Sequence, residues 1–131
     1  MTDRAHERHF TVEEARRTLR EILPALTQLV ELKRQLDAKG FDVYRHQYFG
    51  GMGPNGQKFF PEELEDLVRA ARLINERGIV LKSIDSGLID FPHLRANGEE
   101  VYLCFQYGEP EIEFWHSLDG GFRARRPLDT L

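Results

Sequence analysis

The sequence is short of several features that would point to a particular class of protein. It has a single cysteine, Cys104, so the chain cannot form an internal disulfide or a metal site built from several cysteines. No run approaches the roughly 18 apolar residues of a membrane span. The beginning of the chain also lacks the apolar core of a signal peptide. We therefore expect a protein of a reducing compartment, the cytoplasm, with no membrane contact.

The chain also lacks an excess of positive charge. Its formal net charge is −4 and its pI is near 5.7. Nucleic acids attract basic faces, so this balance argues against a nucleic-acid partner. The basic residues cluster in one place, at Arg123, Arg125 and Arg126. This cluster predicts either a site for a small anionic ligand or a C-terminal segment that pairs with nearby acidic residues, and we favour the second.

What the chain does contain suffices for one globular domain. Hydrophobic residues make up 40% and charged residues 31% of its 131 positions, which is typical of soluble globular proteins. A chain of this length buries about two thirds of the surface it exposes when unfolded. We expect a single domain over residues 1–131, with a loose N-terminal arm at 1–9 and a long loop at 40–60.

The first apolar stripe predicts one long amphipathic helix. Thr11 and Glu14 have the spacing of a capping box, and apolar residues recur at steps of three and four from Ala15 to Leu36. Gly40 marks the end of the helix. Pro24 lies inside the stripe without changing its phase, so we expect a kink rather than a break.

The second stripe predicts a shorter helix that begins at Pro61 and stops at Gly78. At 1.5 Å per residue the two helices are about 40 Å and about 24 Å long, so an antiparallel hairpin leaves part of the first helix without a partner. The connecting loop, the sheet or a second copy of the chain must cover that part. We therefore expect self-association, as a homodimer, through the long helix.

The connection between the helices, residues 40–60, is unusually rich in glycine and aromatic residues. Its glycines and proline are Gly50, Gly51, Gly53, Pro54 and Gly56. Loops of this length are commonly functional or mobile. The composition favours a connection anchored by its aromatic residues, with a flap over a ligand as the alternative.

The remainder of the chain has strand composition. Residues 79–84 predict a strand, whereas residues 88–94 are interrupted by Asp90 and Pro92 and look too broken for a central strand. Residues 101–106 and 111–116 both alternate and predict a hairpin. The expected fold is α+β: an antiparallel helical hairpin packed on a small three-stranded antiparallel sheet.

The register of the predicted hairpin follows from its alternation. Pairing Val101 with His116, Leu103 with Phe114, and Phe105 with Ile112 places the large apolar residues on one face. This register needs a four-residue loop over residues 107–110, because Pro110 cannot close a two-residue turn. The other face then carries Tyr102 beside Trp115 and Cys104 beside Glu113.

Several of these segments resemble a known family. FTVEEAR at residues 10–16, GLIDFP at 87–92, VYLCFQYGEPEIEFWH at 101–116 and RRPL at 125–128 are similar to the uncharacterised prokaryotic domain-of-unknown-function family 2203. The resemblance implies a stand-alone cytoplasmic prokaryotic domain with no assigned activity. The GGMGPNG segment is longer and richer in glycine than the resemblance implies.

Six residues are poorly explained by folding alone and are the candidate binding residues: Asp90, Tyr102, Glu113, Trp115, His116 and Arg126. His116 with nearby carboxylates could hold a divalent metal or serve in acid/base catalysis, although a structural hydrogen bond is the favoured reading. Trp115 beside Tyr102 predicts packing, or else the wall of a small-molecule pocket. Glu113 opposite Cys104 would raise the pKa of that thiol, which argues against a catalytic cysteine.

These observations favour a non-enzymatic, homodimeric interaction or small-ligand-binding protein. No catalytic residue, cofactor or metal ligand is assigned. The alternative is a metal-dependent or acid/base hydrolase-like enzyme that uses His116 with Asp90 and Glu113.

Overall fold

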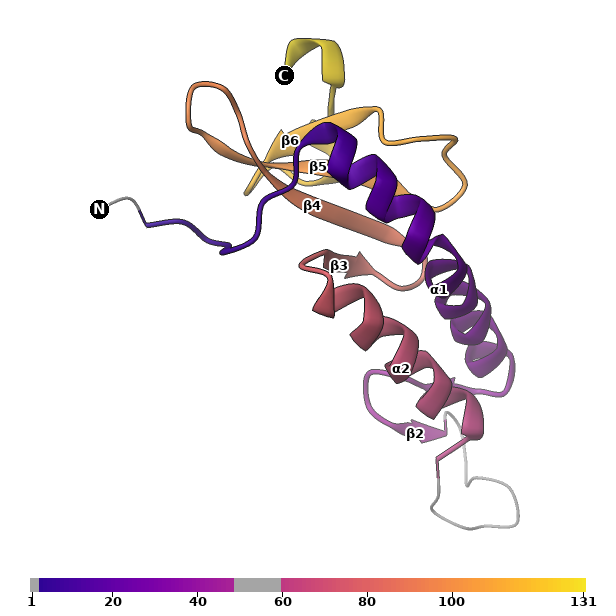
Figure 1. Ribbon diagram of the computed structural model, residues 1–131. Coiled ribbons are helices and arrows are strands. Elements are labelled where there is room, and N and C mark those ends of the chain that lie inside the picture. Colours follow the sequence, from indigo (N-terminus) through magenta and orange to yellow (C-terminus); the bar gives the residue numbers. More distant parts are fainter. Residues whose placement is uncertain (1–2, 49–59) are drawn as a thin grey trace.

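The computed structural model describes residues 3–48 and 60–131, and its fold is α+β, as predicted. The two main helices are α1 (Val12–Ala38) and α2 (Glu62–Glu76) (Figure 1). A two-stranded sheet follows α1, and a five-stranded antiparallel sheet of order β3-β4-β5-β6-β7 follows α2. The strands are β1 (Phe41–Asp42), β2 (Gln47–Tyr48), β3 (Val80–Ser83), β4 (Leu88–Leu94), β5 (Glu100–Gln106), β6 (Phe114–Ser117) and β7 (Arg126–Pro127). The main sheet thus has five strands instead of the predicted three.

The helix α1 begins and continues as its sequence predicts. The Thr11 hydroxyl accepts the Glu14 N–H at 3.0 Å, and the Glu14 carboxylate accepts the Thr11 N–H at 2.9 Å, which completes the capping box. The helix runs without a break through Pro24. None of the helices in the described ranges is long and apolar enough to cross a bilayer.

The helix α1 contributes to two separate hydrophobic cores. Its residues from Ala15 to Val30 pack with the helix-facing side of the large sheet and with Ala70 and Ile74 of α2. Beyond the sheet, Leu32 and Leu36 belong to a second core. The other members of that core are Phe41, Val43, Leu64 and Leu67. Figure 1 shows α1 crossing the sheet with its first half and reaching the β1–β2 hairpin with its end.

The chain therefore covers most of the apolar stripe of α1 by itself. Leu23, at 36% exposure, is the most exposed large apolar residue of α1. Unpaired apolar surface was the reason to expect a dimer through this helix. This argument for a dimer no longer holds, because the large sheet covers the part of α1 that α2 does not reach. Self-association itself stays a prediction.

The strand β4 corrects one expectation: residues 88–94 form a central strand between β3 and β5. The N–H and C=O of a residue in an antiparallel strand point to the same side. The Pro92 carbonyl accepts the Phe10 N–H at 2.7 Å, so the proline nitrogen faces the N-terminal segment and not β5. The pairing of β3 with β4 ends at Val80 and Asp90, so Pro92 lies beyond the end of β3. The proline therefore lies where no ladder donor is needed.

The predicted register of β5 and β6 is wrong by one residue. Leu103 pairs with Trp115, and Tyr102 pairs with His116. The predicted four-residue loop is also wrong, because β6 begins only at Phe114 and residues 107–113 form the connection. Ile112 lies in that connection and is buried in the core, with 0% exposure. Its apolar side chain therefore fitted the alternating pattern of a strand although the residue is not in one. The one-residue shift places Trp115 on the helix-facing side and His116 on the opposite side.

The N-terminal segment, which was expected to be a loose arm, has contacts with β5. It has no regular structure before α1, but the Glu100 carboxylate accepts the N–H groups of Ala5 at 2.8 Å and His6 at 3.0 Å. The same Glu100 carboxylate lies 2.7 Å from His9 Nε2. These bonds attach the arm to β5.

Candidate functional site

The side of the large sheet that faces away from the core carries a buried polar group. Asp90 of β4, Tyr102 and Cys104 of β5, and His116 of β6 are exposed by 1%, 6%, 0% and 2%. Asp90 pairs with Cys104, and Tyr102 pairs with His116, so Asp90 and His116 lie diagonally across β5. Alternation along three neighbouring strands therefore brings these side chains together.

The two ring nitrogens of His116 have different partners. Nδ1 lies 2.6 Å from the Ser117 carbonyl oxygen, and Nε2 lies 3.1 Å from both carboxylate oxygens of Asp90. A carbonyl oxygen only accepts, so Nδ1 carries a hydrogen. The Nε2 lone pair would then face carboxylate lone pairs. A cation, either a proton or a metal ion, must therefore lie between Nε2 and Asp90.

The surroundings set the protonation of each group in the absence of metal. Burial alone would lower the pKa of His116, but the hydrogen bonds to Asp90 and Ser117 raise this pKa above its ordinary value. Burial and then the negative Asp90 raise the pKa of the Cys104 thiol to about 12. Burial, Asp90 and Glu100 also raise the pKa of Tyr102. Without metal, a proton therefore lies between His116 and Asp90, and the Cys104 thiol is neutral.

Asp90, Cys104 and His116 form a compact set of possible metal ligands. A carboxylate oxygen, the sulfur and a ring nitrogen all lie within 4.8 Å of one another. Around a tetrahedral zinc ion, ligand atoms of these types are roughly 3.3–3.6 Å apart. The ligand atoms would therefore have to approach one another by up to about 1.5 Å when a zinc ion binds. The bond from Nδ1 to the Ser117 carbonyl is the outer contact that typically orients a metal-binding histidine.

Two cations flank the buried group. The Lys82 ammonium lies 4.0 Å from Asp90 Oδ2 and 4.7 Å from the centre of the Tyr102 ring. On the side of Cys104, the Arg125 guanidinium donates to both carboxylate oxygens of Glu109 at 3.0 Å. The positive charge of Arg125 opposes the rise in the pKa of Cys104, but burial outweighs it.

The N-terminal arm reaches the site through Tyr102. The phenol oxygen lies 2.6 Å from His6 Nε2, and the ring centre lies 5.5 Å from that of His116. Tyr102 therefore fills the space between the arm and the histidine and helps to keep water from it.

The structure brings together three of the six predicted residues: Asp90, Tyr102 and His116. Glu113 is exposed, and its backbone carbonyl accepts the Leu128 N–H at 3.0 Å. Trp115 lies on the helix-facing side, where its indole N–H donates to Thr130 at 2.9 Å. The exposed Arg126 has its guanidinium 5.3 Å from the centre of the Trp115 ring.

Sequence reasoning missed Lys82, and it named Cys104 and Arg125 without placing them at this site. Tyr102 and Cys104 are two positions apart in a predicted strand, so their spacing indicated that both side chains lie on the same face of the sheet. The incorrect register then placed Glu113 opposite Cys104, where the structure has Phe114. Arg125 was expected in the C-terminal basic cluster, and its ion pair with Glu109 agrees with the favoured interpretation of that cluster. No local pattern marks Lys82, because its position beside Asp90 depends on how distant strands pair.

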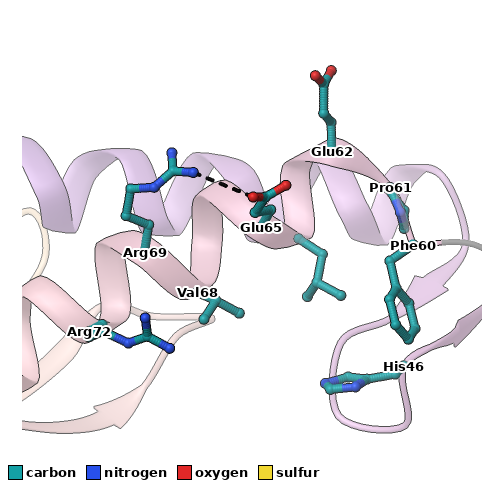
Figure 2. Close-up of a pocket in the computed structure, with 9 residues that line it drawn as sticks. His46, Phe60, Pro61, Glu62, Glu65, Val68, Arg69 and Arg72 are labelled. Atoms are coloured by element: carbon teal, nitrogen blue, oxygen red, sulfur yellow. Dashed lines mark ion pairs between the residues drawn. The ribbon is translucent and has the colours of Figure 1, made fainter.

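A hollow of about 610 Å³ lies at the start of α2, on another part of the surface. Figure 2 shows His46 and Phe60 at one end of it, and their ring centres are 5.5 Å apart. Toward the other end lie Val68 and the pair of Arg69 with Glu65, whose charged atoms are 3.7 Å apart. Exposed apolar and charged side chains of one helix suit contact with another molecule better than chemistry.

The comparison with protein families confirms the resemblance seen in the motifs. A family model described as "Uncharacterized conserved protein (DUF2203)" matches residues 8–128. This range contains the whole buried polar group, but the description assigns no activity. No curated protein and no solved structure matches the chain.

Proposed function

We propose that this chain, which belongs to the DUF2203 family, binds one divalent transition-metal ion through Asp90, Cys104 and His116. The orientation of the histidine carries the proposal. Its Nδ1 is held by the Ser117 carbonyl, and its Nε2 points at a carboxylate beside a thiol. A divalent cation satisfies all three ligands at once, whereas a proton satisfies only Nε2 and Asp90.

The ligand types favour zinc or a similar ion. Thiolate and imidazole are the preferred ligands of zinc, and a carboxylate completes a set of three. Three protein ligands leave a fourth position for water or a ligand, as in catalytic zinc sites. This proposal modifies the metal-dependent alternative from the sequence, because Cys104 takes the role that was considered for Glu113.

The cost of forming the thiolate does not rule out tight binding. The pKa of Cys104 is about 12, against about 8.5 for an ordinary thiol, so forming the thiolate costs roughly 5 kcal/mol more than usual at 1.36 kcal/mol per pH unit. Structural zinc sites contribute about 10–16 kcal/mol at pH 7. The ion can therefore displace the thiol proton and still bind.

Metal titration tests the proposal directly. After removal of metal with a chelator, calorimetry should show one Zn²⁺ bound per chain, and Co²⁺ should produce a cobalt–sulfur absorption band. Cys104→Ser should abolish that band and weaken Zn²⁺ binding by about 10- to 100-fold, as loss of a ligand would. Circular dichroism checks that this variant still folds.

Glu113→Gln is the matched control, because Glu113 is exposed and lies on the chain close to His116. This variant should bind both ions as the unchanged protein does. If the unchanged protein fails to bind Zn²⁺ and Co²⁺ at micromolar concentrations, or if Cys104→Ser retains the cobalt–sulfur band, the proposal is wrong.

Self-association is the second candidate function, through α2 instead of α1. Val68 is 42% exposed beside the hollow of Figure 2. Glu65 lies before Val68 and Arg72 after it, so an antiparallel second copy centred on Val68 brings opposite charges together. Sedimentation should show a dimer that Val68→Glu converts to a monomer. A monomer at micromolar concentration without the substitution would contradict this candidate.

A further inference from the structure

We infer that the metal site takes a small oxyanion, a carboxylate or a phosphate group, as its fourth ligand, and that Lys82 recognises it. This inference rests on the proposed metal binding at Asp90, Cys104 and His116. It goes further by naming the class of ligand and a residue outside the three metal ligands.

Lys82 lies at an irregularity in β3. Leu81 pairs with Ile89, but the next pair joins Ser83 with Leu88, so Lys82 is the extra residue of a β-bulge. Its ammonium lies 4.0 Å from Asp90 Oδ2, on the polar side of the sheet, and the bulge lies directly at this residue. Bulges are common beside active sites, where they redirect a side chain.

Lys82 is also where solvent comes nearest to the site. Its side chain is 37% exposed, whereas the side chains of Asp90 and His116 are each 1% exposed. The other flanking cation, Arg125, already holds Glu109 through two hydrogen bonds. A ligand that enters from solvent therefore meets the Lys82 ammonium first.

Metal binding changes the charge that Lys82 faces. Asp90 is the one ion-pair partner of Lys82 within residues 3–48 and 60–131. When a divalent ion binds, the charges of Asp90 and the Cys104 thiolate neutralise the metal, and Lys82 loses its counterion. Water could fill the fourth position, but only an anion would also neutralise Lys82.

The burial of the three metal ligands limits the fourth ligand to a small anion. Cys104 is fully buried and the Tyr102 ring packs against His116, so the open position lies toward Lys82 at the edge strand β3. Acetate and inorganic phosphate are suitable probes. They share anionic oxygens and differ in size and charge, so the relative affinities distinguish a carboxylate ligand from a phosphate ligand.

The experiment uses the full chain loaded with Co²⁺. Acetate or phosphate should change the visible cobalt spectrum in a saturable way. Lys82→Met should weaken the better anion at least about tenfold while the Co²⁺ affinity changes by less than about threefold. Lys82→Arg should retain most of the anion affinity. Lys39→Met, which removes a lysine paired with Glu63 on the helices, is the control and should change neither affinity.

Each outcome has a definite meaning. If Co²⁺ binds and neither anion changes the spectrum, or if Lys82→Met binds the anion as well as the unchanged protein does, this inference is wrong and the metal site stands. If Co²⁺ does not bind at all, the proposed function fails and this inference fails with it.

Discussion

The buried pair of Asp90 and His116 allows a sharp prediction about stability and pH in the absence of metal. Both side chains are 1% exposed, and the pKa of His116 is raised in the folded protein. A group whose pKa is raised by folding contributes stability that is fully present below its unfolded value, near 6.5, and is lost as the pH rises through the folded value. The pair therefore contributes most at mildly acidic pH.

Asp90→Asn should reverse this dependence. The introduced amide can donate to Nε2, so the variant holds a neutral imidazole in its folded state. At pH 5.5, where unfolded His116 is protonated, breaking the buried ion pair should cost about 3–5 kcal/mol. This penalty, the loss in the free energy of unfolding caused by Asp90→Asn, should shrink by up to about 1.4 kcal/mol for each unit by which the pH rises. It should fall to about 1 kcal/mol at alkaline pH.

Urea unfolding followed by circular dichroism, with a chelator present at pH 5.5, 7 and 8.5, measures the penalty. Glu113→Gln should change the free energy of unfolding by less than about 0.5 kcal/mol throughout. If Asp90→Asn does not fold at pH 5.5, its trend between pH 7 and 8.5 still tests the sign. A penalty that is constant or that grows with pH would refute an imidazolium at His116.

Two further predictions concern the metal and the arm. The apparent Zn²⁺ affinity should rise with pH, about tenfold per unit for each proton displaced, because the ion competes with protons on His116 and Cys104; an affinity that does not change from pH 6 to 8 would contradict these ligands. Glu100→Gln should cost about 1–3 kcal/mol and speed cleavage by trypsin after Arg8, because it weakens the bonds that hold Ala5 and His9; cleavage at the unchanged rate would show that other contacts hold the arm.

The sequence alone predicts the helices well because their signals are local. The capping box at Thr11 and Glu14, the apolar stripe of α1 and the glycine after it involve neighbours along the chain, and the structure has α1 at Val12–Ala38. Lys33 interrupts the stripe and is still buried, because Asp37 at 2.8 Å and Asp85 at 2.6 Å hold its ammonium. Asp85 is far along the chain, so the stripe could not indicate that pair.

The strands show where local signals stop. Whether Pro92 breaks β4 depends on which segment lies beside it. The Phe10 N–H, from a distant part of the chain, donates to the Pro92 carbonyl, so no strand needs a donor from Pro92 on that side. The Gly-rich part of residues 40–60 falls in 49–59, outside the described residues, so the choice between a flap and a packed connection stays open. Within the described part, residues 41–48 form the β1–β2 hairpin and place Phe41 in the second core.

The sequence by itself determined the helix boundaries, the α+β class and the family. It singled out six candidate residues, of which Asp90, Tyr102 and His116 lie together in the structure. Only the tertiary structure decided which residues share the site. In a strand, side chains alternate between two faces. A shift of one residue in the pairing of two strands therefore moves every side chain of one strand to the other face and gives it new neighbours. That shift placed Trp115 in the core and His116 beside Asp90 and Cys104, and it left Glu113 in solvent.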